Sequence, residues 1–236
     1  VAVDTETNSL DPHQADLVGV SLSSKIGKAC YIPIGHKSNK CIEKDLVLKK
    51  LKPLLEDPSI KKIGQNIKFD FIVFFKHGIN MTSMEDTMLM SYVLDAGKNR
   101  HNMDTLSEIH LNHKTISFKD LVGTGKKEIN FSEVDVEKAK DYAAEDADIT
   151  FRLYKKFQKS LKDEKMINIY EIFEKPLLKI LAFMEIEGVK IDNKFLKSLS
   201  TKFEKKITKI QNEVFKISKR EFNIANQVTG TSVLEE

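Results

Sequence analysis

The first seven residues, VAVDTET, place two acidic side chains in a short stretch rich in valine. Such a stretch is typical of a β-strand, along which side chains alternate between the two faces. Asp4 and Glu6 therefore share one face, and Val3 and Thr5 share the other. Two neighbouring carboxylates on a buried strand repel each other and lose hydration, so they need a positive partner or a bound proton. On this stretch alone, a pair of acids that face solvent is an equally good interpretation.

Three residues far along the chain decide between these interpretations. Asp70 lies in NIKFD, where helix capping is the simplest role for an isolated aspartate. Tyr142 and Asp146 are four residues apart in a long helical pattern, so they share a face, and the alanines beside them let that face approach a sheet closely. The same periodicity predicts that Glu145 and Asp148 point elsewhere, into solvent.

A metal site follows if Asp4, Glu6, Asp70 and Asp146 converge. Each pair of like charges at about 4 Å costs on the order of 4 kcal/mol at an effective dielectric near 20, so the set requires cations. Ligands that are all oxygen select Mg²⁺ or Mn²⁺ rather than zinc. Two such ions held by shared carboxylates activate water and stabilise the leaving oxygen in phosphodiester cleavage, and Tyr142 could hold the attacking water.

Composition narrows the class of protein. The 236 residues are 41% hydrophobic and 31% charged, which is typical of a globular chain with a core. The net charge of +3 does not by itself indicate nucleic-acid binding. Cys30 and Cys41 lack zinc-type spacing and are expected as ordinary thiols in a reducing compartment. No apolar run has membrane-span length and no signal peptide is recognisable, and the initial Val1 leads us to expect a piece of a longer protein.

Hydrophobic periodicity predicts the elements that position these residues. We expect strands over 1–7, 17–22, 29–34 and 61–64. We expect helices over 43–55, 64–79, 84–94, 103–111, 136–161, 167–187 and 193–222. Residues 114–131 are expected to form a loop or short elements, and 189–191 a short strand or turn. A strand meander followed by helices predicts a mixed α/β sheet domain, and the lysine-rich helices after about residue 163 predict a second, smaller helical unit.

Three sequence motifs resemble one nuclease superfamily. DTET at 4–7, NIKFD at 66–70 and YAAED at 142–146 resemble the signature of DEDD-type 3′–5′ exonucleases, and Tyr142 marks the subclass that has tyrosine. The intervening sequence, such as EDTMLMSYVLD and HKTISFKDLVGTGK, resembles the proofreading domain of bacterial family A DNA polymerases, the DNA polymerase I type. The resemblance runs from residue 1 to about residue 224, and residues 225–236 depart from it.

The resemblance implies an architecture. The expected fold is α/β and RNase H-like, with a mixed five-stranded sheet flanked by helices and followed by a small helical segment. Residues 1–162 would form the 3′–5′ exonuclease domain. Residues 163–236 would form a helical connection and the beginning of the polymerase thumb.

The resemblance also implies catalytic roles for five residues: Asp4, Glu6, Asp70, Tyr142 and Asp146. Two divalent cations, Mg²⁺ or Mn²⁺, would be the cofactors. Asp4, Glu6 and Asp146 would hold the tighter ion, while Asp4 would bridge to the second with the aid of Asp70. Glu6 and Tyr142 would contact the attacking water, and a nucleoside 5′-monophosphate would leave the 3′ end.

Six further residues are implied to contact DNA: Leu10, Gln65, Asn66, Phe69, Arg100 and Phe118. Leu10 would wedge between the last bases and Phe118 would stack on the 3′-terminal region. From the residues alone, these two are better explained as a turn leucine and a core phenylalanine. Gln65 and Asn66 would lie by the terminal nucleotides, and Arg100 is a candidate phosphate contact. Relatives often have tyrosine at position 69, so Phe69 would keep stacking but lose a hydroxyl.

The function implied is proofreading within a DNA polymerase I during DNA replication and repair. The partners would be a single-stranded 3′ end at a primer terminus and the palm and fingers domains of the same full-length chain. A monomer in the bacterial cytoplasm, associated with the nucleoid and not with a membrane, is expected. Two alternatives remain: a catalytically silent structural exonuclease domain, and a stand-alone exoribonuclease of the RNase D type. The complete carboxylate set argues against the first, and the thumb-like helices argue against the second.

Overall fold

The computed structural model describes residues 1–37 and 41–224. The expected departure from the family after residue 224 therefore lies outside the described residues. The chain divides into two compact units, Val1–Glu187 and a second that begins at Gly188. Residues 163–187 belong to the first compact unit. The expected boundary between an exonuclease domain and a thumb connection at residue 163 stays a prediction.

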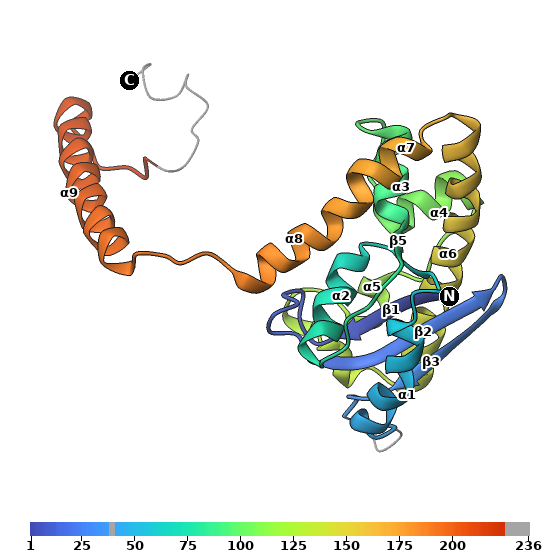
Figure 1. The fold of residues 1–236 in the computed structure, drawn as a ribbon. Helices are drawn as coiled ribbons and strands as arrows, with labels where there is room; N and C mark the ends of the chain where they lie inside the picture. Colours follow the sequence, from blue (N-terminus) through green and yellow to red (C-terminus); the bar gives the residue numbers. More distant parts are fainter. Residues whose placement is uncertain (38–40, 225–236) are drawn as a thin grey trace. The chain divides into compact units, whose positions relative to one another are not determined.

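A five-stranded mixed sheet forms the centre of the first unit (Figure 1). Its strands are β1 (Ala2–Thr7), β2 (Leu17–Lys25), β3 (Lys28–Pro33), β4 (Lys62–Gly64) and β5 (Met84–Asp86). Their order across the sheet is β3-β2-β1-β4-β5, with β1, β2 and β3 antiparallel and β4 and β5 parallel to β1. The predicted mixed sheet is confirmed, and β1 lies in its middle.

Helices surround this sheet. They are α1 (Lys44–Glu56), α2 (Ile67–Lys76), α3 (Thr87–Asp95), α4 (Met103–Leu111), α5 (Phe118–Val122), α6 (Val136–Asp163), α7 (Ile167–Ile169) and α8 (Lys175–Glu187). Short 3₁₀ turns, η1 (Gly125–Lys127) and η2 (Phe131–Glu133), lie before α6, and a π-helical turn, η3 (Tyr170–Glu174), precedes α8.

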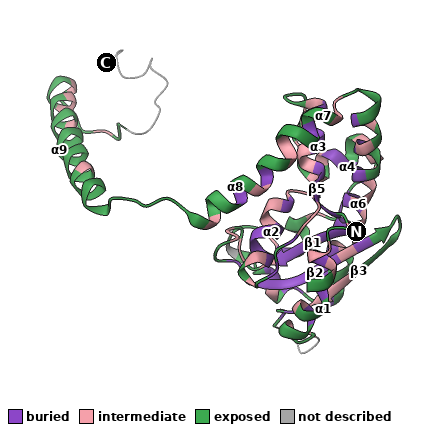
Figure 2. Ribbon diagram, viewed as in Figure 1, coloured by how far each residue is buried: buried purple, intermediate pink, exposed green. Residues whose placement is uncertain are grey.

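Alternation along β1 distributes its side chains between two helix layers. Val3 packs in a core with α1, α2 and α8, whereas Ala2 packs in a second core with α3, α4 and α6. Four of the six residues of β1 are buried, and the strand is coloured accordingly in Figure 2. Because side chains alternate, Asp4 and Glu6 point with Ala2 toward the layer that contains α6.

The two helices that carry the other predicted site residues are fixed by apolar packing. In α2, Ile67, Phe71, Ile72 and Phe74 are fully buried, and each contributes roughly 1.5–3 kcal/mol to the free energy of unfolding. In α6, alanines at every fourth position are fully buried, which lets the helix backbone lie close to the sheet as predicted: Ala139, Ala143 and Ala147. Both helices are therefore held rigidly beside β1.

Several elements differ from the predictions. The helix expected over 84–94 begins only at Thr87, because Met84–Asp86 pairs with β4 as a strand. The helix expected from residue 64 begins at Ile67, since Asn66 adopts a left-handed backbone conformation with φ 63°. Asparagine tolerates that conformation better than most residues. Residues 189–191 form no strand.

The described part of the second unit consists mainly of α9 (Asn193–Ser218). The Asp192 side chain caps its first turn by accepting hydrogen bonds from the backbone N–H groups of Lys194 and Phe195. The helix predicted over 193–222 is confirmed from Asn193 but ends at Ser218, and none of its residues is buried (Figure 2). Among the described helices, none has the length and apolar character needed to cross a membrane.

Candidate active site

A cavity of about 430 Å³ opens where β1 ends, between α2, α6 and the segment from Phe118 to Phe131. All of the predicted site residues except Arg100 line it: Asp4, Glu6, Leu10, Gln65, Asn66, Phe69, Asp70, Phe118, Tyr142 and Asp146. Arg100 is exposed and does not line this cavity. The structure thus brings together residues separated by up to 142 positions in the sequence.

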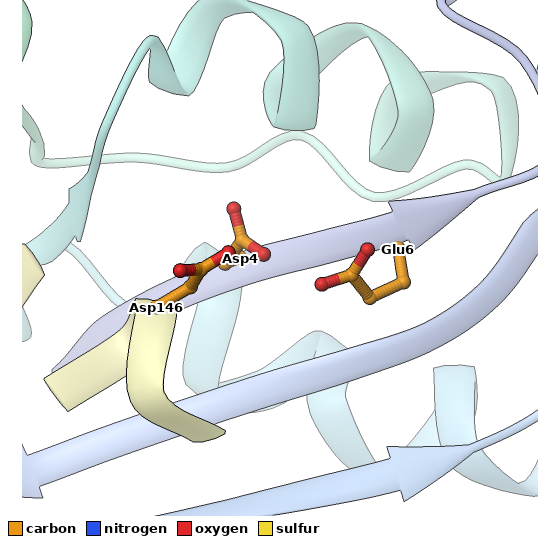
Figure 3. A group of neighbouring side chains, drawn as sticks. All are labelled: Asp4, Glu6 and Asp146. Carbon is orange, nitrogen blue, oxygen red and sulfur yellow. The ribbon is translucent and has the colours of Figure 1, made fainter. Parts of the chain in front are cut away.

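Three carboxylates form a tight cluster in this cavity. Asp4, Glu6 and Asp146 each offer an oxygen, and these oxygens lie within 4.8 Å of one another. Figure 3 shows Asp146, from α6, beside Asp4, with Glu6 farther along β1. Alternation on the strand supplies the first two groups and the buried face of the helix supplies the third.

Asp70 lies next to this cluster but outside it. Its Oδ1 atom accepts a hydrogen bond from the Thr5 backbone N–H at 2.9 Å and another from the Thr5 hydroxyl at 2.6 Å. Asp70 does not cap α2, because its partner is on β1. One carboxylate oxygen is therefore fixed by the sheet, while the residue still lines the cavity.

Burial raises the pKa of all four acids, and repulsion between the carboxylates adds to this for Glu6, Asp70 and Asp146. Burial raises the pKa of Asp4 to about 6. The pKa of Glu6 is well above its usual range because of burial and the charges of Asp4, Asp146 and Asp70. Burial and the charge of Asp4 raise the pKa of Asp70 and of Asp146 in the same direction. The protein holds acids where their ionised forms are costly.

The donor set fits divalent cations. Within the described residues, no lysine, arginine or histidine forms an ion pair with any of the four acids. The Glu6 Oε1 atom is buried without a hydrogen-bond partner. Carboxylates that lie in a cavity without a cationic side-chain partner and offer only oxygen ligands suit a hard ion such as Mg²⁺ or Mn²⁺.

Aromatic rings form one wall of the cavity. Phe118 stacks on Phe131 with ring centres 6.1 Å apart, and both rings contact Tyr142, at 5.9 and 6.2 Å. Burial and the charges of Asp146, Glu6 and Asp4 raise the pKa of Tyr142 far above its ordinary value. Both causes favour the protonated hydroxyl, which can donate or accept a hydrogen bond.

The other residues predicted to contact DNA differ in exposure and in whether their side chains already have hydrogen-bond partners. Leu10 is 94% exposed on the loop after β1, and Phe69 is half-buried. The Gln65 side chain is already engaged, since its amide nitrogen donates to the His101 carbonyl and its oxygen accepts from the Thr87 hydroxyl. Gln65 thus holds the cavity wall together, and only rearrangement would free its amide.

Sequence reasoning missed several residues of this site. Met103, Ile129 and Asn130 also line the cavity, and no motif or periodicity marks them. The prediction that Glu145 and Asp148 face solvent is wrong. Glu145 hydrogen-bonds the segment before Phe118, and Asp148 pairs with Arg152 and accepts from the Gly27 backbone N–H, because distant segments pack on this side of α6.

Comparison with known proteins gives a consistent assignment. Residues 1–162 match the protein family described as 3′–5′ exonuclease. The chain is similar to DNA polymerase I of Rhizobium leguminosarum, with 40% identity over 248 aligned residues that cover 96% of this chain and 24% of that protein. The DNA polymerase I of Pseudomonas aeruginosa is 37% identical over 96% of this chain. The chain spans about a quarter of the length of these curated relatives.

Solved structures support the fold assignment. An apo form of a nuclease superposes with a TM-score of 0.65 at 24% identity, covering 81% of this chain and 87% of that one. Brucella melitensis NrnC with bound Mg²⁺ has a TM-score of 0.60 at 27% identity, covering 80% and 88%. NrnC has also been solved bound to pGG. The predicted RNase H-like fold, a mixed five-stranded sheet flanked by helices, is confirmed.

Proposed function

The chain belongs to the 3′–5′ exonuclease family, and on that premise we propose that it removes nucleotides from the 3′ end of DNA by hydrolysis that depends on two divalent cations. Its polymerase relatives support DNA as the substrate. The observation that carries the proposal is the cluster of Asp4, Glu6 and Asp146 in one cavity, where no lysine, arginine or histidine among the described residues forms an ion pair with them.

The carboxylates would hold the cations. Asp4, Glu6 and Asp146 would bind one ion, and Asp4 would share a second with Asp70, whose free oxygen completes the set. Bound there, Mg²⁺ or Mn²⁺ would lower the pKa of a water molecule and stabilise the leaving oxygen. The raised pKa values of these acids support this assignment, because positive charge in the cavity would offset the cost of ionising them.

The other residues of the cavity would position the reactants. Tyr142, protonated and four residues from Asp146, would orient the attacking water together with Glu6. Phe118, exposed at the cavity, would stack on a base at the 3′ end. Leu10 would separate the last bases, and Phe69 would pack against the terminal nucleotide. Asn66 and Gln65 would border that nucleotide, with Gln65 acting through the wall that it holds.

Arg100 enters this proposal only as a more distant phosphate contact. It is exposed and outside the cavity, so a strand longer than the terminal nucleotides would be needed to reach it. Its replacement should therefore affect binding of long strands more than cleavage of short ones.

The wider role is proofreading within a bacterial DNA polymerase I during replication and repair. Residues 163–236 would connect the exonuclease domain to the thumb. The palm and fingers domains of the same longer chain, which would act as a monomer in the cytoplasm at the nucleoid, would deliver the primer terminus. The extent of the similarity, 96% of this chain, supports this role.

The test is a Mg²⁺-dependent assay on 5′-labelled single-stranded and mismatched duplex DNA. The wild-type chain should shorten both from the 3′ end, Asp70→Ala should leave them intact, and Asp141→Ala, an exposed acid on α6, should match the wild type. Equal cleavage by wild type and Asp70→Ala would reject the mechanism. No cleavage by the wild type would favour a catalytically silent domain.

One observation favours a second candidate, an exoribonuclease that acts on short RNA. The chain is similar to NrnC, which has been solved bound to pGG. The same assay with an RNA strand of equal sequence separates the two candidates, because much faster loss of RNA than of DNA would favour the exoribonuclease.

A further inference from the structure

Glu145 occupies a place in the structure that its sequence pattern does not predict. Its side chain is only 18% exposed. Glu145 directly precedes Asp146 on α6, so its side chain leaves the helix on a different face from that of Asp146. Its Oε1 atom lies 2.7 Å from His113 Nε2, and its Oε2 atom accepts a hydrogen bond from the Ile116 backbone N–H at 2.6 Å. Both carboxylate oxygens thus bind the segment 112–117.

The same segment is fixed on its other side by α4. The Ser107 hydroxyl donates to the His113 carbonyl at 2.8 Å, and the Thr115 hydroxyl donates to Asp104 at 2.7 Å. Segment 112–117 therefore spans from α4 to α6, and Glu145 supplies its hydrogen bonds to α6.

Phe118 begins α5 directly after this segment. Its ring is 42% exposed, lines the cavity and contacts Phe131 and Tyr142. The Ser117 side chain makes no capping hydrogen bond to α5, so the helix of five residues has little local stabilisation. Burial of Val122 anchors the far end of α5, so the first turn, which carries Phe118, depends on the segment that precedes it.

We propose that Glu145 is a positioning residue that holds segment 112–117 against α6 and thereby fixes Phe118 at the cavity, where the ring seats a base of the substrate strand. This inference rests on the proposed function, because it assigns the ring to a single-stranded 3′ end. Glu145 itself touches neither substrate nor cation in this role.

Binding of a 5′-fluorescein oligothymidylate in EDTA, followed by anisotropy, tests the inference without catalysis. Phe118→Ala should weaken binding about tenfold through loss of base stacking. Glu145→Ala should weaken it by a similar factor, and the double variant should bind no more weakly than Phe118→Ala alone. Glu145→Gln should stay within about twofold of the wild type, because its amide oxygen can still accept from the Ile116 N–H.

Two controls separate positioning from damage to the fold. Asp148→Ala removes a carboxylate on α6 that holds Gly27 instead, so it should bind like the wild type. His113→Ala removes one of the two contacts that Glu145 makes with the segment. It should weaken binding about threefold where Glu145→Ala weakens it about tenfold. The rise in melting temperature with Mn²⁺ should be unchanged in Glu145→Ala.

Unchanged binding in Glu145→Ala would overturn the inference, as would an effect that multiplies fully with that of Phe118→Ala. Loss of the Mn²⁺ response in Glu145→Ala would also overturn it, since Glu145 would then act on the carboxylate cluster. These results differ from failure of the proposed function, in which the wild-type chain itself would neither bind nor cleave the oligonucleotide.

Discussion

In the first unit, the buried acid Glu85 and the four cavity acids differ in how their charge is balanced. Glu85 on β5 is 2% exposed, yet Lys61 and Lys175 lie 2.9 and 2.8 Å from its Oε1 atom and the Tyr170 hydroxyl donates to Oε2 at 3.1 Å. The cavity acids have no such cations among the described residues. The fold can neutralise a buried carboxylate with its own side chains, and in the cavity it does not.

The physical consequence is a division of roles. The contacts of Glu85 join β5 to η3 and α8, so its charge contributes to folding. The cavity acids repel one another and raise one another's pKa values, so their ionised forms weaken the cation-free fold. An acid cluster that opposes folding is explained by a ligand that reverses its cost.

Replacing a cavity acid should give the largest change in activity. Asp146→Asn removes a cation ligand, so cleavage of single-stranded DNA in Mg²⁺ should fall by about a thousandfold, or about 4 kcal/mol of transition-state stabilisation. Rates measured at saturating substrate, with circular dichroism to verify the fold, check this. Activity within tenfold of the wild type would mean that the cluster is not the catalytic site.

Replacing the internally balanced acid should instead affect stability. Glu85→Gln leaves Lys61 and Lys175 without their shared anion, and the free energy of unfolding should fall by about 1–2 kcal/mol, because both lysines reach solvent and Lys175 keeps Glu171. Urea unfolding at neutral pH measures the loss, while cleavage below the melting temperature should stay near the wild-type rate. A large loss of cleavage with unchanged stability would contradict the division between the two groups.

Tyr142→Phe sharpens the comparison inside the cavity. The ring contacts with Phe118 and Phe131 remain, but the hydroxyl that would orient water is lost. Turnover should fall by about 10- to 100-fold while the unfolding free energy changes by less than about 1 kcal/mol. Steady-state kinetics beside urea unfolding provide both values, and an unchanged turnover would exclude a role for the hydroxyl.

The pH dependence of stability gives the smallest expected effect. A carboxyl whose pKa is higher in the folded chain than in the unfolded chain binds protons on folding, so stability in EDTA falls as pH rises from about 4 through the folded value. Asp146→Asn lacks this loss. It should be more stable than the wild type at pH near 8 and nearly equal to it near pH 4, as measured by urea unfolding. Equal stability at both pH values would show that the acid is not destabilising.

Strand alternation and helical spacing were sufficient to predict which site residues share a face. Alternation along β1 predicted that Asp4 and Glu6 share a face, and helical spacing predicted the same for Tyr142 and Asp146. That these two faces meet followed from the resemblance, because neither pattern alone shows which sheet face receives α6. The buried alanines of α6 were also predictable, since small residues at helical spacing permit close packing.

Long-range contacts explain what sequence reasoning missed. β5 is three residues long and becomes a strand only through its pairing with β4. Glu145 and Asp148 occupy helix positions that look solvated until segments 112–117 and 25–28 pack there. The role of Gln65 in the cavity wall depends on Thr87 and His101, more than twenty residues away. Periodicity carries no information about such partners.

Cation binding by the cavity acids can be measured through stability alone. Thermal unfolding of the wild type, Asp146→Asn and Glu85→Gln would be compared in EDTA and in millimolar Mn²⁺. Because a ligand that binds only the folded chain stabilises it, Mn²⁺ should raise the melting temperature of the wild type and of Glu85→Gln clearly more than that of Asp146→Asn, which loses a ligand of one cation. An equal shift in all three proteins, or none in the wild type, would contradict the assignment of the cluster as a cation site.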